Sequence, residues 1–378
     1  MNLLIFEYKK ILKRRKSIII FLLLISLVCV LLFVNHRINK TIDASKAEEY
    51  GLKISSINDA VNSLPDNDEN NERLKNIEKE YKSEVNLLEK QIVALKNGDW
   101  KEELKIQILI DKSHLESLKN GEAIGGEPIT VIESRIGLNE QLLSKGIKPI
   151  NEKFATQGIY FLKTILNILM GFLGIFIIIF IVGDVLAVEF DKGTIKFLYT
   201  NPISKNTIIN SKTIVALSIS LFIILTVGFI AFLLGSVFWG IGSLNYPIPI
   251  YKQEVITYMD IFQFLMLSAV LFFFVLVFFV CFVIFLSIIT NSSLLAISLT
   301  IIISAVLFLG VNNFGYFASI SHLLPFSYIN TFKIIDGSAA SLLNNSNLTL
   351  QFGIFVLLLS SILIHFTSLT LSRRKEIY

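Results

Sequence analysis

The sequence DIFQFLMLSAVLFFFVLVFFVCFVIFLSII occupies residues 260–289 of a 378-residue chain and carries no charge after Asp260. A helix needs about 20 mainly apolar residues to cross the hydrocarbon core of a bilayer, so this stretch is long enough to span it. A short turn at 290–292 separates this stretch from the next one, although residues 260–311 could also divide into two spans at another point. Five further apolar stretches lie at 17–34, 159–183, 211–240, 293–311 and 351–371. Together they predict an all-α polytopic membrane protein with six transmembrane helices, and they exclude a soluble enzyme, a disordered chain and a disulfide-framed secreted domain.

Charged residues gather in one polar insert between the first two spans. Residues 36–158 hold 18 Lys/Arg and 22 Asp/Glu, which is 40 of the 64 charged side chains in the chain. Both signs are mixed along the insert, a pattern typical of a solvated surface rather than of a face that binds polyanions. We therefore expect no nucleic acid among the partners.

The positions of lysine and arginine predict the orientation in the membrane. Six of these residues precede the first span, which we place at 17–35, and the positive-inside rule keeps them in the cytoplasm. No small-residue cleavage site follows the apolar run, so an uncleaved span fits better than a signal peptide. The segments then predicted as cytoplasmic hold 13 Lys/Arg, whereas the two short outer loops hold only Lys252 and Lys333. This predicts a multi-pass protein of the cell (plasma) membrane with cytoplasmic termini, an extracellular segment at 36–158 and helices 2–6 in residues 159–378.

Residues 1–16 predict a cytoplasmic amphipathic helix. Their apolar side chains recur at helical spacing, opposite a face rich in lysine and arginine, which favours an interfacial helix on the inner leaflet of the lipid bilayer. An ordinary solvated basic tail is the alternative. The apolar positions are Leu4, Ile5, Tyr8, Ile11 and Leu12.

The insert itself has a helical pattern. Seven apolar residues have a mean spacing of 3.5 residues, the period of helices that pack along a seam. The pattern breaks at 97–99, a second helical stretch covers Trp100–Lys119, and a third follows Pro128 through Ile132–Leu143. We therefore predict a large helical extracellular insert, hairpin-like or coiled-coil-like, in which the seam serves packing rather than a binding groove. The seven positions are Leu74, Ile77, Tyr81, Val85, Leu88, Ile92 and Leu95.

Several kinds of chemistry have no support in the sequence. There is no GxxxxGK[ST] loop, so we expect neither a nucleotide-binding nor a catalytic motif in this chain, and no enzyme activity of its own. The four His are scattered, and Cys29 and Cys281 lie in apolar runs, so no cofactor or metal site is expected. Ionisable residues are nearly absent from the span interiors, which argues against an ion-coupled transporter. Active transport would therefore need energy from a partner.

The inner loop between the second and third spans, residues 184–212, is the most informative segment. Gly193-Thr194 can end one helical element and start another, with the threonine as N-cap. The residues that follow give a short helix near 194–201 an apolar face suited to a groove on a partner. Asn201-Pro202 ends this helix, and Ser204 can cap the next one. The apolar residues of the short helix are Ile195, Phe197, Leu198 and Tyr199.

This loop resembles the permease subunit of type-2 ATP-binding-cassette (ABC) exporters, and the resemblance covers most of the chain except residues 36–158. It rests on Glu189, Gly193, Thr194, Leu198, Pro202, Ile203, Ser204, Lys205 and Lys212. The resemblance implies a coupling helix that docks on a cytoplasmic ABC ATPase subunit, which binds ATP and Mg, and a second permease copy, identical or different. The implied ATPase-coupling residues are Glu189, Gly193, Thr194, Ile195, Phe197, Leu198, Tyr199, Pro202 and Ser204. An ordinary helix-end carboxylate is the alternative role for Glu189.

The outer loop after the fifth span, residues 312–350, holds the second candidate site. The same resemblance implies a re-entrant segment with a gating role here, and short helices broken by proline could dip into the membrane where protein covers their backbone. A belt of aromatic residues at the membrane interface explains the same side chains without a gate. The candidate residues are Phe314, Tyr316, Pro325, Phe326 and Tyr328.

The resemblance implies the membrane subunit of an ATP-driven exporter that moves a peptide, antibiotic or lipid-like substrate outward. Two alternatives stay open. In a mechanotransmission-type ABC permease, the ATPase would work the extracellular domain and nothing would cross the membrane. In a membrane sensor or receptor, residues 36–158 would bind a ligand and no stoichiometric ATPase would be present. The abundance of Ile, Lys and Asn is typical of a low-GC bacterial genome.

Overall fold

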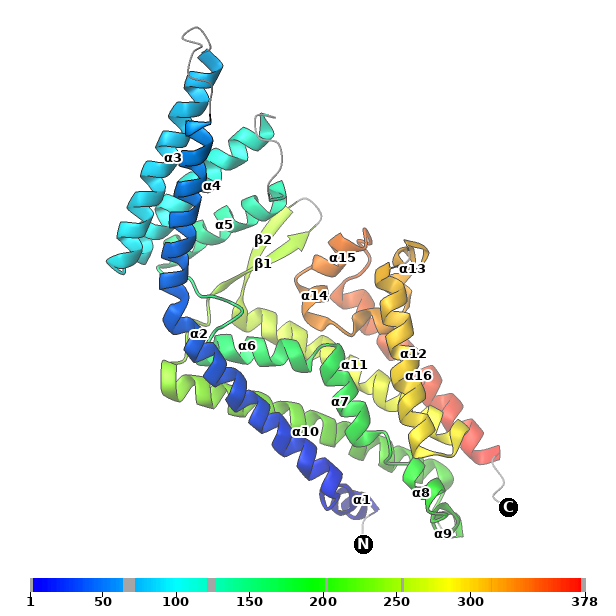
Figure 1. Ribbon diagram of the computed structural model, residues 1–378. Coiled ribbons are helices and arrows are strands. Elements are labelled where there is room, and N and C mark those ends of the chain that lie inside the picture. The colour runs from blue at the N-terminus through cyan, green and yellow to red at the C-terminus, as the bar shows by residue number, and fades with distance from the viewer. Residues whose placement is uncertain are drawn as a thin grey trace. The chain divides into compact units, whose positions relative to one another are not determined.

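The computed structural model describes residues 3–63, 72–120, 127–200, 203–252, 255–313 and 315–374 (Figure 1). Its contacts divide the chain into two compact units. The membrane unit comprises Met1–Leu32, Gln157–Leu244 and Ile250–Tyr378, and the insert unit comprises Phe33–Thr156 and Asn245–Pro249.

Within the described residues, six helical stretches are long and apolar enough to cross a membrane. They are α2 (Arg15–Asn62), Phe172–Asp191 with α7 (Phe172–Val182) and α8 (Ala187–Asp191), α10 (Lys205–Trp239), α11 (Ile261–Thr290), α12 (Ser293–Asn313) and α16 (Leu350–Arg374). The predicted all-α polytopic fold with six spans is therefore confirmed. Helix α2 continues well beyond residue 35, where we placed the end of the first span, because a helix need not stop where it leaves the bilayer.

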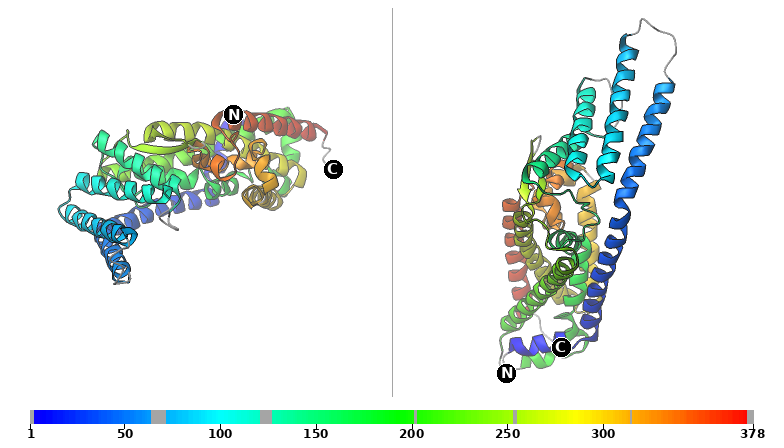
Figure 2. Two further views of the ribbon diagram at one scale, coloured as in Figure 1. Left: turned by 90° about the horizontal axis from the view of Figure 1, so that it is seen from above. Right: turned by 90° about the vertical axis from the view of Figure 1, so that its left-hand side faces the viewer.

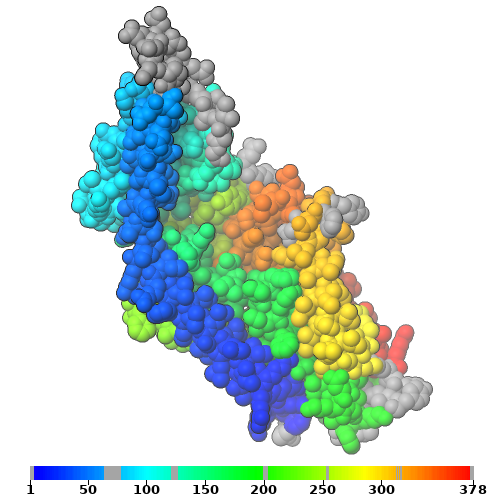
Figure 3. All heavy atoms as spheres, in the orientation of Figure 1, coloured from blue at the N-terminus to red at the C-terminus, as the bar shows by residue number. Residues whose placement is uncertain are grey.

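Helix α11 lies at the centre of the membrane unit. It packs against α16, α12 and α10, and 61% of its most apolar window is buried, against 22% for α12 and for α16. The peripheral helices expose large apolar side chains, among them Leu23 of α2 and Val306 of α12. The surfaces of α2 and α12 face the viewer in Figure 3. In a bilayer, such side chains are matched by lipid or by another membrane protein.

The second span is not the single helix that the apolar stretch 159–183 suggests. The chain forms α6 (Gly158–Leu169), breaks at Met170–Gly171, and resumes as α7. A Cβ at Gly174 would overlap the carbonyl oxygen of Leu169, so only glycine allows the first turn of α7 to lie this close to the end of α6. The break was not predicted because glycines within an apolar stretch are also tolerated in continuous membrane helices.

The segment between α10 and α11 contains an element that the sequence analysis described only as an outer loop. Strands β1 (Pro247–Lys252) and β2 (Val255–Asp260) pair in a two-stranded sheet. The backbone N–H of Tyr251 donates to the carbonyl oxygen of Asp336 at 2.7 Å, which ties β1 to the outer segment of the membrane unit.

The outer segment consists of short helices, as its proline and glycine suggest. They are α13 (Gly315–Ser319), η1 (Ser321–Leu323), η2 (Pro325–Tyr328), α14 (Thr331–Ile335) and α15 (Ser338–Leu342). Pro325 begins η2, the Phe326 ring packs against three phenylalanines of α11, and the hydroxyl of buried Tyr328 donates to the carbonyl of His322 at 2.7 Å. Phe314 and the side chain of Tyr316 lie outside the described residues. Re-entry into the membrane stays a prediction.

The insert unit is helical, and its hairpin bends where we expected. Helices α3 (Glu72–Lys96) and α4 (Trp100–Lys119) pack together, and α4 packs on α5 (Ile129–Lys145), as Figure 2 also shows. Gly98 adopts a left-handed φ of 71°, and the Asp99 side chain accepts the backbone N–H of Glu102 at 3.1 Å. That the insert lies outside the cell stays a prediction.

A chain of polar side chains crosses the interior of the insert unit. Gln91 of α3, with no exposed surface, donates to the hydroxyl of Tyr50 (3.2 Å) and to the side-chain oxygen of Gln107 (2.8 Å). Tyr50 and Gln107 in turn contact two buried carboxylates. Glu103 lies 3.4 Å from the Tyr50 hydroxyl, and Asp111 lies 2.9 Å from the Gln107 amide. Each carboxylate pairs with a cation of another helix: Glu103 with Lys46 of α2 (2.8 Å) and Asp111 with Arg135 of α5 (2.8 Å). The chain therefore links four helices.

Candidate functional site

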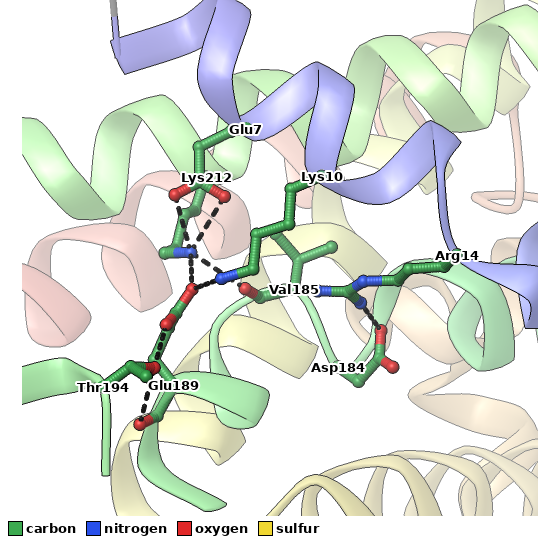
Figure 4. A network of polar contacts seen from close by, with 8 residues as sticks. All are labelled: Glu7, Lys10, Arg14, Asp184, Val185, Glu189, Thr194 and Lys212. Atoms are coloured by element: carbon green, nitrogen blue, oxygen red, sulfur yellow. Dashed lines mark hydrogen bonds and ion pairs between the residues drawn. The ribbon is translucent and has the colours of Figure 1, made fainter. Parts of the chain in front are cut away.

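A buried lysine organises the inner loop of the membrane unit. Lys212, in the third turn of α10, has no exposed surface. Its ammonium group lies 3.0 Å from the carboxylates of Glu7 and Glu189 and donates to the carbonyl oxygen of Val185 at 3.0 Å (Figure 4). These contacts use all three ammonium donors and join α10 to α8 and to α1 (Leu3–Leu12).

The charges around Lys212 balance. Glu7 and Glu189 are each 2% exposed at the side chain, and Lys10 of α1 supplies a second ammonium that binds the Glu189 carboxylate. A buried charge is tolerated only when it is paired and hydrogen-bonded, so two cations for two carboxylates form a neutral cluster. Removal of any one member would leave an uncompensated charge. Because its members come from three separate segments, the cluster fixes these segments against one another.

Thr194 extends this cluster to the short helix α9 (Ile195–Thr200). Its hydroxyl donates to the second carboxylate oxygen of Glu189, so Glu189 bonds to the neighbouring turn, as the resemblance implied (Figure 4). Gly193 precedes it with a left-handed φ of 65°, which reverses the chain between α8 and α9. The turn at 193–194 is therefore bonded directly to the carboxylate that pairs with Lys212.

A second set of ion pairs joins the N-terminal segment to the end of α7. Arg14 donates to Asp184 at 2.6 Å, and the Lys16 ammonium lies 3.5 Å from the other oxygen of the same carboxylate. Asp191 accepts the backbone N–H of Ser293 at the start of α12, at 3.1 Å. The inner loop thus contacts the beginnings of α2, α10 and α12.

The predicted coupling residues divide into a buried and an exposed set. Glu189 and Ile195 are buried, whereas Leu198 is half-buried and Phe197 is 74% exposed. Ser204 caps α10 by accepting the backbone N–H of Thr207 at 3.1 Å. Pro202 and the side chain of Tyr199 lie outside the described residues. Of the nine predicted residues, the structure brings Glu189 and Thr194 together in the cluster and places Gly193 between them.

Sequence reasoning missed three members of the cluster as site residues: Glu7, Lys10 and Lys212. One signal was available. Glu7 is the only acidic residue among the first 42, and Lys212 is the only charged residue between Lys205 and Lys252. Lys212 is thus an isolated charge at the start of an apolar span, and such a charge demands a partner. The partner lies 205 positions away in sequence, so no local pattern identifies it.

Comparison with known proteins identifies the family. A family model described as ABC-2 family transporter protein matches residues 1–367. The chain belongs to the ABC-2 transporter family. The match includes residues 36–158, which the resemblance drawn from the inner loop left out. It confirms the predicted membrane transport permease, a component that is not itself catalytic and that associates with an ABC ATPase subunit and a membrane. No curated protein and no solved structure matches this ABC-2 permease.

Proposed function

We propose that this permease couples ATP hydrolysis in a separate cytoplasmic ABC ATPase subunit to outward movement of a peptide, an antibiotic or a lipid-like substrate. One observation carries the proposal: the short helix α9, the expected docking site, is tied by buried ion pairs to helices of the membrane unit. Thr194 bonds to Glu189, and Glu189 pairs with Lys212 of α10 and with Lys10 of α1. A displacement of α9 therefore reaches two other helices.

The two faces of α9 suit this role. Phe197 projects a mostly exposed ring, whereas Ile195, two positions earlier, is only 3% exposed. An exposed apolar side chain on a short helix fits a hydrophobic groove on a partner, and the buried side rests on the membrane unit. ATP binding in the partner would favour one arrangement of the spans and hydrolysis would reset it, because the ATPase contacts the two arrangements differently.

The working assembly contains two permeases and two ATPase subunits, with ATP and Mg bound by the ATPases. The substrate path lies at the interface between the permeases. Helices α2, α12 and α16 suit this interface, because only 17% of the most apolar window of α2 and 22% of that of α12 and of α16 is buried within the chain. The termini and the inner loop lie in the cytoplasm, and residues 36–158 and 312–350 lie outside.

Substitution of Phe197 tests the docking site. We expect Phe197→Asp to leave membrane insertion intact and to weaken ATPase binding by at least about tenfold, because a charge replaces an exposed aromatic anchor. Co-purification of the tagged permease with its ATPase, quantified by mass spectrometry, measures the effect. Leu342→Asp is the matched control, since Leu342 of α15 is also 74% exposed and lies on the side predicted to be extracellular. Equal ATPase recovery with both variants would exclude α9 as the docking helix.

A second candidate is the mechanotransmission type, in which ATP-driven motion works the insert. The compact insert unit, with its own polar chain across four helices, favours it. Replacing residues 63–145 by a Gly/Ser linker distinguishes an exporter from a mechanotransmission-type permease. An exporter should keep ATP-driven substrate movement, whereas a mechanotransmitter should keep ATPase assembly and lose its output. A sensor would lack a stoichiometric ATPase even before the deletion.

A further inference from the structure

The break between α6 and α7 lies inside the apolar stretch 159–183 and frees backbone groups of a helix end. The last carbonyls of α6 and the first N–H groups of α7 have no partners within a continuous helix. In a bilayer each unsatisfied group costs several kcal/mol, so a break persists only where protein supplies the missing bonds. At this break, a residue of the outer segment bonds to one of the freed carbonyls.

Thr331, the first residue of α14, binds the C-terminal end of α6. Its hydroxyl donates to the carbonyl oxygen of Met170 at 3.1 Å, and its backbone N–H points to the same oxygen at 3.4 Å. Thr331 has no exposed surface, and Met170 is 5% exposed, so water does not compete for this carbonyl. The two segments are 161 residues apart in sequence. We call this pair of bonds the Thr331 clasp.

The surroundings of the break leave little room for another arrangement. A Cβ at Gly171 would lie 3.0 Å from the carbonyl oxygen of Asn167 and 3.2 Å from the side-chain oxygen of Asn330. Gly174 is packed against the end of α6 in the same way. The residue before the clasp therefore also touches the break. A close backbone approach at two glycines is what a bend between two rigid helices requires.

The break and the clasp connect the two ends of the membrane unit. The inner end of α7 leads to Asp184, held by Arg14, and on to Glu189 in the buried cluster. The part of the outer segment that follows the clasp is fixed again at Asp336, whose carbonyl accepts the N–H of Tyr251. Helix α7 thus has the coupling loop at one end and the outer segment bonded at the other.

We propose that Thr331 is a positioning residue of the transport cycle: it holds the outer segment on the α6–α7 break, so that a tilt of α7 driven from α9 moves that segment. The inference rests on the proposed coupling through α9 and adds its route to the outer side. Thr331 touches neither nucleotide nor ATPase in this scheme. Its effect is to make the outer segment follow α7.

The clasp can be tested without any ATPase. We expect Thr331→Val, which keeps the shape and loses the hydroxyl, to speed amide hydrogen exchange in residues 329–336 and 172–175 by about fivefold, the usual effect of one lost hydrogen bond. The measurement uses the full-length permease in lipid nanodiscs. Thr331→Ser should restore slow exchange, because it keeps the hydroxyl. Ser327→Ala is the matched control, since the Ser327 hydroxyl in the same segment is buried and bonds to none of the described residues. Equal exchange in Thr331→Val and Ser327→Ala would overturn the clasp.

The route to the outer side is tested in the assembled complex. Cys29→Ser and Cys281→Ala first remove the native cysteines. Leu342→Cys then places a single cysteine at an exposed position of the outer segment, and its rate of labelling by an impermeant maleimide reports on that segment. We expect ATP to change this rate at least about threefold in the parent and in Thr331→Ser, and to have no effect in Thr331→Val, although all three bind the ATPase equally. An unchanged ATP response in Thr331→Val, or no response in a parent that binds ATPase, would overturn the proposal. Failure of the parent to bind any ATPase would instead refute the proposed function, while the exchange experiment would still decide whether the clasp exists.

Discussion

Each unit contains a buried polar network, and the two networks are built differently. Among the described residues of the insert unit, each buried carboxylate has its own cation: Lys46 for Glu103 and Arg135 for Asp111. These cations are 39% and 34% exposed, and the neutral amide of Gln91 joins the two ends. Hydrogen bonds to Asp111 raise the pKa of Arg135 above its ordinary value, so this cation stays charged at any physiological pH.

In the membrane unit the partly exposed Lys10 binds one carboxylate, but the buried cation Lys212 is shared by two, Glu7 and Glu189. None of these last three groups has more than 2% of its side chain exposed. Burial removes most of the solvation of each charge, and only mutual pairing compensates for the loss. The insert network can therefore lose one bond locally, whereas the Lys212 cluster depends on all its members together. This difference suits a scaffold in the first case and a link between moving segments in the second.

The largest effect should come from Lys212→Met. Methionine fills a similar volume, but Glu7 then loses its ion pair and Glu189 keeps only Lys10. Breaking a buried ion pair from one side costs about 3–5 kcal/mol. We expect the melting temperature in detergent to fall by about 5–10 °C. ATPase binding should also weaken, because the turn at Thr194 loses its support.

Lys192→Met is the matched control, since Lys192 belongs to the same loop and is exposed. Adding Glu7→Gln to Lys212→Met should recover part of the stability, because Lys10 still pairs with Glu189 and Glu7 is the carboxylate that has lost its ion pair. Equal melting temperatures for Lys212→Met and Lys192→Met would show that the cluster does not hold the segments together.

The sequence predicts elements well where one physical demand dominates. Residues 260–289 are apolar on every side, and the structure forms α11 from Ile261 to Thr290. The hairpin bend at Gly98 was also readable, because glycine and asparagine interrupt a regular seam. In both places the local residues alone determine the result.

The remaining features depend on partners distant in sequence. The break at Met170–Gly171 is bonded by Thr331, and nothing in the apolar run signals that a threonine 161 residues from Met170 binds its freed carbonyl. Strands β1 and β2 lie in a segment read as a loop because each is only six residues long. The resemblance of the inner loop identified Glu189 and Thr194 as coupling residues. Only the fold shows that Lys212 pairs with Glu189.

An intermediate loss of stability is expected at Gln91, the centre of the chain of polar side chains in the insert unit. Gln91→Met keeps the volume and removes both donated bonds, which leaves Tyr50 and Gln107 each short of a partner at a cost of about 1–3 kcal/mol. Amide exchange in α3 and α4 should speed up, while ATPase binding stays unchanged. Lys90→Met, at the exposed neighbour on the same turn, is the control. Loss of ATPase binding in Gln91→Met would contradict the division between scaffold and link.

The smallest effect should come from Asp99→Ala at the hairpin bend. The Asp99 side chain accepts the N–H of Glu102, and loss of such a cap costs about 1 kcal/mol. Asp99→Asn should behave like the parent, because asparagine caps equally well. The effects of Asp99→Ala and Gln91→Met should therefore differ in how far they extend through the insert unit as well as in magnitude. A lost cap frees one helix end, so exchange should speed up only in the first turn of α4, whereas Gln91→Met removes bonds between helices and should loosen α3 and α4 together. If Asp99→Ala loosened both helices as far as Gln91→Met does, the bend rather than the buried polar chain would hold the insert together.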